Sequence, residues 1–437
     1  MSTDVERAGI VIVGAGLAGL AASGELRRAG VPHRVLEASD APGGLGRTVE
    51  EVGYRFDRTG HLLHVRDPEL RAELLALCGP HSLLELERRA MVFSRGVMTR
   101  YPYQSNVDGL PPEVKYECVL GFLRAQAGKP VARARTFEEF CLQHFGEAIC
   151  REFMIPYNEK VWGVHPRELS AVWCERFVPI PTVEDVLRGA FGVAGPPLGY
   201  NARFLYPRVG TGALTQALAS RATVLETGTP VERVDYRARR VRANGVWLPY
   251  SALASTMPLD RLVALLDDPP SEIQRASAAL RSVPVHYLDI ALNTPCLADW
   301  HWVYVPEARY PFYRVGAYSN FSAAMAPPGK AALWVELSSR SAPDVPTLLP
   351  IVGDALVEMG AIRSREAIRF ARARKIDPAY VIYDEAREVA VPLLLAWLRE
   401  QGIWSFGRYG AWEYSSMQDA ILSGRAAARE LLAVSAP

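Results

Sequence analysis

The pattern of apolar and polar positions near the start of the chain predicts a strand, a helix and a second strand. Residues 10–13 are a continuous apolar run rich in β-branched side chains, which is typical of a strand buried on both faces. Apolar positions with helical spacing follow in residues 17–29, and residues 33–36 form a second short apolar run. This succession predicts a βαβ unit in a parallel sheet.

Glycines occupy the expected turn between the first strand and the helix. Gly14, Gly16 and Gly19 have the GxGxxG spacing of a dinucleotide-binding turn. Gly14 permits the tight turn, Gly16 lets a pyrophosphate approach the backbone, and Gly19 lets the helix pack closely on the strand. Glu37, at the end of the second run, suits a ribose hydroxyl. The pattern therefore predicts a dinucleotide site; an ordinary glycine-rich turn is the alternative.

Both periodicities return later in the chain. Helical spacing marks the middle and the C-terminal end, and strand alternation marks the region between them. A proline- and glycine-rich stretch interrupts the helical part and holds one short helix. The expected helices are 113–125, 137–145, 147–157, 184–188 within the stretch 177–206, 214–219 and 416–431, and the expected antiparallel strands lie within 283–340.

Composition narrows the functional classes. With 437 residues the chain is long enough for two or three subdomains, and its net charge of +1 argues against a nucleic-acid partner. The six cysteines lack CxxC or metal-ligand spacing, so we expect reduced thiols and no metal site. No signal peptide and no membrane span are expected, which favours a cytoplasmic location.

The stretch after Glu37 distinguishes between dinucleotides. Gly43, Gly44 and Arg47 lie in the run APGGLGRT. This run resembles the second glycine pair and the arginine of the FAD-binding amine oxidase superfamily. The resemblance implies FAD rather than NAD as the cofactor, with this backbone beside the diphosphate and the flavin.

Four further stretches resemble the UDP-galactopyranose mutases of that superfamily. The first is TGHLLH at residues 59–64, which is similar to a Gly-Pro-His-aromatic-His run. His61 matches the histidine that lies against the flavin, and Gly60 replaces the proline. The alternative for His61 is a core histidine with satisfied hydrogen bonds.

The second and third stretches supply arginines. Residues 157–171 and Arg176 are similar to a mutase run in which a tyrosine touches phosphate, a tryptophan begins a mobile lid, and an arginine closes on the diphosphate. Tyr157 and Trp162 match the first two. Residues 310–314, with Arg314, resemble the segment that supplies a second substrate arginine. Two guanidinium groups suit one pyrophosphate. The alternatives are a surface salt bridge for Arg176 and a cross-strand ion pair for Arg314.

The fourth stretch, residues 407–417, resembles the mutase signature Gly-Arg-x-Gly-x-x-x-Tyr-x-x-Met. The resemblance implies that Arg408 lies by FAD and that Tyr414 contacts a substrate phosphate. It also implies that the following helix points its positive end at the flavin, which favours an anionic reduced flavin. Tyr380 matches another phosphate-binding tyrosine.

The chain also departs from the mutases. Asn158, Met154 and Gln104 stand where other residue types hold uracil and its ribose in that family. Residues 206–212 are more similar to the amine oxidase and protoporphyrinogen oxidase pattern than to a mutase lid.

Together these observations predict an α/β fold. It consists of a Rossmann-like FAD-binding domain with a helical insert and an antiparallel β-sheet substrate domain. The expected segments are 5–77, 207–258 and 384–437 for FAD, 107–195 for the helical domain with a mobile lid, and 78–106, 196–206 and 259–383 for the sheet domain.

The resemblance implies a flavin-dependent mutase that converts a nucleotide-activated hexopyranose to its furanose form through a flavin N5–sugar adduct on reduced FAD. An FAD-dependent oxidase or desaturase is the alternative, and a non-catalytic nucleotide-sugar binder is the third hypothesis. The expected partners are the nucleotide-diphosphate sugar, an external electron donor such as NAD(P)H, and a second copy in a homodimer.

The expected catalytic residues are Arg176, Arg314 and His61. The expected cofactor-binding residues are Gly14, Gly16, Gly19, Glu37, Gly43, Gly44, Arg47, Gly60, His61, Val231, Gly407, Arg408 and Met417. The expected substrate-binding residues are Phe153, Tyr157, Asn158, Trp162, Arg176, Arg314, Tyr380, Tyr414 and Gln104.

Overall fold

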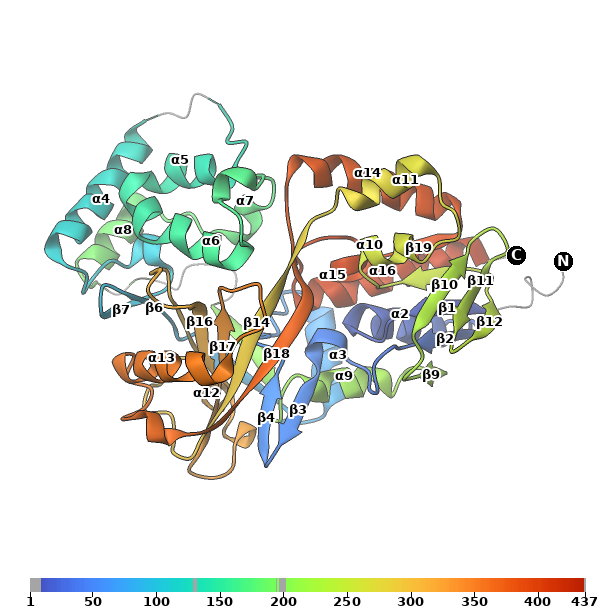
Figure 1. Ribbon diagram of the computed structural model, residues 1–437, viewed down its shortest axis with the longest axis horizontal. Helices are drawn as coiled ribbons and strands as arrows, with labels where there is room; N and C mark the ends of the chain where they lie inside the picture. Colours follow the sequence, from blue (N-terminus) through green and yellow to red (C-terminus); the bar gives the residue numbers. More distant parts are fainter. Residues whose placement is uncertain (1–8, 129–131, 194, 196–201, 436–437) are drawn as a thin grey trace.

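A computed structural model describes residues 9–128, 132–193, 195 and 202–435 of the chain. Two sheets lie side by side, and a group of helices covers one end of the second sheet (Figure 1). The mixed α/β architecture predicted from the sequence is confirmed. Within the expected domain segments, residues 5–8, 129–131, 194, 196–201 and 436–437 lie outside the described residues.

The glycine motif belongs to a five-stranded parallel sheet with the order β19-β13-β1-β2-β9. β1 is central and all four of its residues are buried, as its apolar run predicts. Helix α2 follows it directly and packs against α16 and α9. The strands are β1 (Ile10–Val13), β2 (His33–Leu36), β9 (Leu225–Glu226), β13 (Leu253–Ser255) and β19 (Ile403–Ser405), and the helices include α2 (Leu17–Arg28), α3 (Pro68–Cys78), α9 (Gly212–Ala219), α10 (Leu259–Ala264), α11 (Ser271–Ala278), α14 (Glu385–Glu400), α15 (Gly407–Gly410) and α16 (Met417–Ser435).

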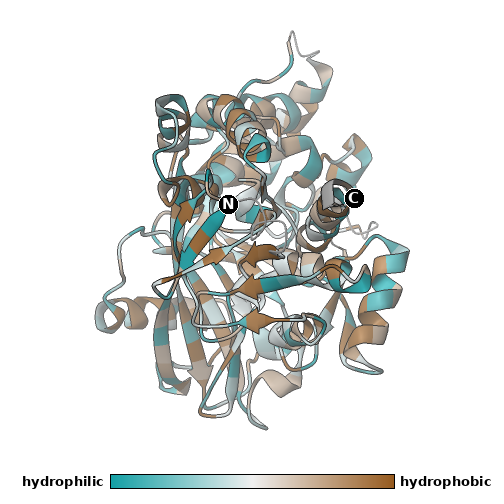
Figure 2. Cartoon of the chain, turned by 90° about the vertical axis from the view of Figure 1, so that its right-hand side faces the viewer, coloured by the Kyte–Doolittle hydropathy of each residue, from teal (hydrophilic) through white to brown (hydrophobic). Residues whose placement is uncertain are grey.

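The second large sheet has seven strands in the order β18-β14-β17-β16-β15-β6-β7. Adjacent strands in this sheet are antiparallel, except that β15 and β6 run parallel to each other. Figure 2, in which the right-hand side of Figure 1 faces the viewer, shows brown, hydrophobic arrows in the interior and teal, hydrophilic segments on several outer helices. The seven strands of the second sheet come from residues 90–381. They are β6 (Ala90–Ser94), β7 (Val97–Arg100), β14 (Ser282–Leu292), β15 (Trp302–Tyr304), β16 (Phe312–Ala317), β17 (Ala331–Leu337) and β18 (Ile368–Val381), with α12 (Tyr318–Phe321) and α13 (Val345–Glu358) beside them. Smaller sheets pair β3 (Thr48–Glu51) with β4 (Tyr54–Asp57), β5 (Leu83–Glu87) with β8 (Arg203–Pro207), and β10 (Val231–Asp235) with β11 (Arg240–Ala243) and β12 (Val246–Pro249).

The helical group contains five of the nine residues expected to bind substrate, Phe153, Tyr157, Asn158, Trp162 and Arg176. Thr136 and Glu139 form a capping box at the start of α5, the helix expected over 137–145. Gly146 interrupts the helix with a φ of 78°, and a Cβ at this position would lie 2.3 Å from the Gly121 carbonyl oxygen of α4. A π-helix then leads into α6, where one helix was expected over 147–157. The helices are α4 (Pro112–Ala127), α5 (Phe137–Ile149), the π-helix Cys150–Met154, α6 (Ile155–Trp162), α7 (Cys174–Phe177) and α8 (Val183–Ala190).

Three long elements, α13, α14 and β18, have residue patterns that only weakly predict their secondary structure. Helices α13 and α14 each contain an internal proline, Pro350 and Pro392, which lowers the helical signal. Strand β18 alternates arginine with apolar residues and is partly exposed along most of its length. Pairing with the buried strand β14, rather than its own residue pattern, therefore stabilises β18 as a strand.

No helix in the described ranges has the length and apolar character needed to cross a lipid bilayer.

Candidate active site

A cavity of about 800 Å³ runs from the glycine turn after β1 to the helical group. Its walls come from the turn between β1 and α2, strands β14, β16 and β18, helix α6, and the start of α16. Segments distant in sequence therefore contribute to one site.

The glycine turn leaves little space around its backbone. Gly14 has a φ of 98°, and a Cβ there would come 2.2 Å from Thr256 Oγ1. A Cβ at Gly44 would lie 3.1 Å from the Gly16 Cα, so two glycine backbones face each other across the cavity wall. At Gly19 a Cβ would meet the Gly14 carbonyl oxygen at 1.9 Å, because helix and strand pack closely. This geometry suits a ligand that lies directly against main chain.

The start of α2 fits a diphosphate. Its N-cap is Gly16, no side chain caps it, and no acid occupies its first turn. Uncapped N–H groups and the positive end of the helix favour an anion. Glu37 lines the same end of the cavity. Its carboxylate accepts hydrogen bonds from Ala15 N at 2.7 Å and Ser39 N at 2.8 Å, which fixes its orientation and leaves lone pairs for a ribose hydroxyl. These residues fit FAD.

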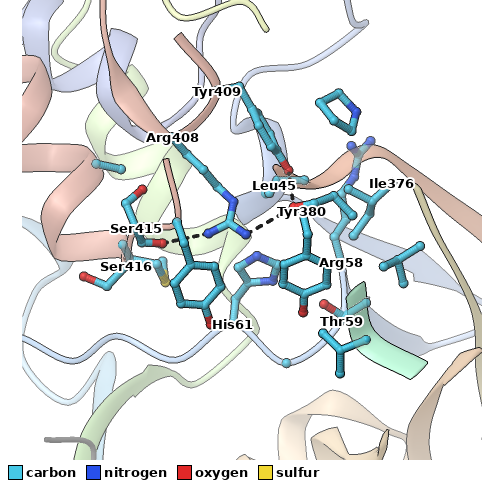
Figure 3. A pocket seen from close by; sticks show the side chains of 18 of the residues that line it. Leu45, Arg58, Thr59, His61, Ile376, Tyr380, Arg408, Tyr409, Ser415 and Ser416 are labelled. Carbon is cyan, nitrogen blue, oxygen red and sulfur yellow. Dashed lines mark hydrogen bonds between the residues drawn. The ribbon is translucent and has the colours of Figure 1, made fainter. Parts of the chain in front are cut away.

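Three expected cofactor residues, Gly19, Arg47 and Val231, do not line the cavity. Arg47 pairs with the exposed Asp40 at 2.8 Å, and Val231 lies in β10. Leu45, between the second glycine pair and Arg47, lines the cavity instead (Figure 3). The other expected cofactor residues that line it are Gly43, Gly44, Gly60, His61, Gly407, Arg408 and Met417, whereas Gly19 acts behind the wall.

Arg408 points into the cavity beside His61 and Tyr380 (Figure 3). Its guanidinium donates hydrogen bonds to the carbonyl oxygens of Ser415 at 2.9 Å and Ala379 at 3.1 Å. Within the described ranges no carboxylate lies within ion-pair distance of it, and its Nε has no partner. The site thus holds a positive charge without a protein counter-ion, and an anionic ligand would supply one.

His61 is neutral at pH 7. Burial, together with the charges of Arg408 and Arg314, lowers its pKa to about 4. Its Nδ1 is buried without a hydrogen-bond partner. One ring nitrogen of this cavity-lining histidine therefore lacks a side-chain or main-chain partner in the described part of the chain.

Arg314 both lines the cavity and forms a cross-strand ion pair. Its Nε and Nη2 donate to Glu336 at 2.7 and 2.8 Å, directly across β16 and β17. Trp334 Nε1 also donates to Glu336, at 2.9 Å. Burial opposes the charge of Arg314, but the Glu336 carboxylate raises its pKa well above the usual value. The arginine is therefore charged, fixed in direction and neutralised.

Tyrosines surround Arg314. Burial raises the pKa of both Tyr157 and Tyr380, against the opposing charge of Arg314, so both hydroxyls remain hydrogen-bond donors. Tyr380 stacks on Tyr414, with ring centroids 6.1 Å apart, and lies 5.3 Å from Trp162. Tyrosine hydroxyl donors and Arg314 thus line the same cavity as His61 and Arg408.

Gln104 and Asn158 line the cavity but already have protein partners. Gln104 Nε2 donates to the Pro179 carbonyl oxygen at 2.8 Å. Asn158 Nδ2 donates to the Met154 carbonyl oxygen at 2.7 Å, and its Oδ1 accepts from Trp162 Nε1 at 3.2 Å. Phe153 stacks on Tyr157 with centroids 5.1 Å apart. The end of the cavity around Phe153 is therefore aromatic, and the side-chain amides of Gln104 and Asn158 already hydrogen-bond within the protein.

Arg176 lies outside the cavity lining. It pairs with Asp419 at 2.7 Å, whereas its neighbours Phe177, Val178 and Pro179 line the cavity. The structure thus does not bring Arg176 and Arg314 together.

Other lining residues were not anticipated. Glu336 could have been found from its alternation with Trp334 on a predicted strand, and Tyr304 from the strand at 302–305. Trp173 and Arg58 carry no local signal, because only the tertiary fold brings them to the wall.

The fold and the cavity define an FAD-binding protein with a second, mainly antiparallel sheet. The profile of the flavin-containing amine oxidoreductase family matches residues 17–373. The chain belongs to this family, and its cofactor is FAD.

Solved structures with the same fold include a reduced UDP-galactopyranose mutase. It is 26% identical, with a TM-score of 0.91 over 98% of this chain and 94% of that one. Putrescine oxidase bound to putrescine has a TM-score of 0.67 at 18% identity, over 98% and 99% of the two chains.

Curated relatives include carotenoid desaturases. Hydroxyneurosporene desaturase of Cereibacter sphaeroides is 26% identical over 336 residues, which cover 69% of this chain and 64% of that protein. Phytoene desaturase (lycopene-forming) of Pantoea ananas is 40% identical over 68 residues, 16% of this chain and 13% of that protein. The chain thus spans less than two thirds of both relatives. Together these findings support a flavin oxidoreductase-type enzyme.

Proposed function

We propose that the protein is a flavin-dependent mutase that converts a nucleotide-activated hexopyranose to its furanose form. The observation that carries the proposal is the convergence of Arg314, Tyr157, Tyr380 and Tyr414 on the cavity beside His61. The close structural similarity to a UDP-galactopyranose mutase over nearly the whole chain supports it.

Reduced FAD would supply a nucleophile for the anomeric carbon, and an external donor such as NAD(P)H would reduce it. The protein's own side chains act on the diphosphate. As the anomeric C–O bond breaks, the leaving diphosphate gains charge, which Arg314 and the tyrosine hydroxyls stabilise. The ring C–O bond would then break and the ring would reclose on a different hydroxyl, and the diphosphate oxygen would return to the anomeric carbon as the nucleophile leaves, without net oxidation. Neutral His61 adds no charge that would compete with the substrate.

An FAD-dependent desaturase or oxidase is the second candidate. The similarity to carotenoid desaturases favours it, as do the aromatic residues Phe137, Trp173 and Phe177 in the cavity wall. Glu336 already neutralises Arg314, which lessens the need for an anionic substrate.

An anaerobic assay separates the two candidates. The FAD-loaded protein is reduced with dithionite and incubated with UDP-, dTDP- and GDP-hexoses, and the products are separated by chromatography. The mutase proposal requires an isomer of equal mass that forms only with reduced flavin. No isomer in this assay, together with oxygen uptake by the oxidised enzyme in a separate aerobic assay with amine, porphyrinogen or polyene substrates, would favour the second candidate.

A further inference from the structure

The C-terminal end of α6 is held against the second sheet by one arginine. Arg340 lies in the segment between β17 and α13, and its Nη2 donates hydrogen bonds to the carbonyl oxygens of Lys160 and Val161, both at 2.9 Å. Its Nη1 donates to the Pro284 carbonyl oxygen, near the start of β14, at 3.2 Å. One guanidinium group therefore joins the last turn of the helix to a strand of the sheet.

The end of α6 is built to receive this cation. The last carbonyl oxygens of a helix lack partners within it, and they carry the negative end of the helix dipole. Gly163 caps the helix with a φ of 68°, and a Cβ there would lie only 2.6 Å from Arg340 Nε. In the part of the chain that the structure describes, Arg340 has no carboxylate within ion-pair distance. Its hydrogen bonds therefore go to main-chain carbonyl oxygens.

A second cation holds the same turn. Lys160 Nζ donates to the carbonyl oxygens of Val305 at 2.9 Å and Glu307 at 2.8 Å, in the segment that follows β15. Helix α6 also contacts β16 and lies beside the strands of the second sheet in Figure 1. The last turn of α6 is thus joined to the sheet at two places.

This turn carries Trp162 into the cavity wall. Trp162 is buried, and its ring centroid lies 5.3 Å from that of Tyr380 and 6.4 Å from that of Tyr414. Its indole N–H donates to Asn158 Oδ1, one turn earlier in the helix. Arg340 itself does not line the cavity. The arginine can therefore affect a ligand only through the residues that it holds.

We propose that Arg340 is a positioning residue of the active site, which fixes Trp162 against Tyr380 and Tyr414 by binding the terminal carbonyl oxygens of α6. The inference rests on the proposed function, because that function assigns the two tyrosines to the diphosphate. Without Arg340 the last turn of α6 loses the partners of two carbonyl oxygens, and the indole loses its fixed position. The tyrosines then lose a packing neighbour, and small displacements of binding groups weaken the ligand.

Near-ultraviolet circular dichroism of the FAD-loaded full-length protein tests the position of Trp162 without any ligand. The contribution of Trp162 is the difference between the parent spectrum and that of Trp162→Phe. In an Arg340→Met background we expect this difference to fall below about half, because an indole without fixed packing gives little signal. Arg340→Lys should restore most of it, since the ammonium group of Lys160 already binds two carbonyl oxygens at once.

The matched control for these spectra is Arg55→Met. Arg55 also donates to a main-chain carbonyl oxygen, that of Ala324 at 2.7 Å, and it does not line the cavity. This variant should leave the Trp162 difference unchanged, which separates a specific effect on α6 from a general loosening of the fold.

Calorimetric titration with UDP tests the consequence for the site. Arg340→Met should keep the FAD absorption spectrum and raise the Kd of UDP at least about fivefold. The rise should be smaller in the Trp162→Phe background, because the two substitutions act through one side chain. An unchanged Trp162 signal, an unchanged Kd, or an equal rise in both backgrounds would overturn the proposal. If the parent protein binds no UDP, the proposed function fails, and the dichroism spectra alone decide the role of Arg340.

Discussion

Arg314 and Glu336 face each other across β16 and β17 and are joined by two parallel hydrogen bonds of 2.7 and 2.8 Å. Glu336 is 1% exposed, and the arginine side chain is 19% exposed toward the cavity. Burial of such a pair costs desolvation energy that its geometry largely offsets. The pair thus fixes the direction of a charged group at the site.

Removal of the carboxylate should destabilise the protein strongly. Glu336→Gln leaves the Arg314 charge buried without a counter-ion, and we expect the free energy of unfolding to fall by about 3–5 kcal/mol. Urea denaturation of the protein measures the change. The double variant Arg314→Met/Glu336→Gln should recover most of the loss, because no buried charge then remains; a double variant as unstable as the single one would contradict this account.

The two arginines should matter for the diphosphate and not for FAD. Arg176→Ala and Arg314→Ala are expected to retain the FAD absorption spectrum and to weaken UDP binding at least about tenfold, because each removes a charged hydrogen-bond donor. Titration with UDP measures the loss. Arg135→Ala, an exposed arginine paired with Glu385, is the control. Unchanged UDP affinity in both variants would refute their assignment to the substrate.

The glycine turn should tolerate no side chain. Gly14→Ala combines a φ of 98° with a Cβ only 2.2 Å from Thr256 Oγ1, so we expect loss of bound FAD. Gly30→Ala is a matched control, because its φ of 71° is also positive and nothing lies within 4 Å of the added carbon. It should cost about 1–2 kcal/mol of stability and keep the cofactor. Absorption spectra of the two purified variants make the comparison, and FAD retained by Gly14→Ala would refute this prediction.

Buried histidines should make the fold sensitive to acid. Burial, with the charge of Arg89, lowers the pKa of His301 to about 4, and burial lowers that of His61 to a similar value. Because the folded pKa lies below the unfolded value of about 6.5, the stability is complete above pH 6.5 and is lost as the pH falls toward 4. At pH 5 each histidine should account for a loss of about 2 kcal/mol.

Urea unfolding at pH 7 and pH 5 measures this loss. His301→Asn preserves an acceptor for the Arg89 N–H, which His301 Nδ1 accepts at 3.1 Å, and removes the titrating group. The variant should therefore lose less stability between the two pH values than the parent protein. An identical loss would show that His301 does not contribute.

Local patterns determined the nucleotide-binding part of the protein. The apolar run of β1, the glycines and the spacing to Glu37 all act within one βαβ unit, where neighbours in sequence are neighbours in space. The capping box at Thr136 and the turn between β6 and β7 are local in the same sense, because each is formed by residues close together in the sequence. Each signal arises from backbone geometry that the local residues themselves impose, so the sequence was sufficient.

The remainder depended on contacts between distant segments. No local rule pairs β6 with β15, gives order to the arginine-rich β18, or places Leu45 in the cavity and Arg47 on Asp40. From the sequence, Arg176 and Arg314 were candidate ligands of a diphosphate, and an ion pair within the protein was the alternative for each. Only the tertiary structure supplied Asp419 and Glu336 as their partners, because the energy of a charge depends on which opposite charge the fold brings within reach.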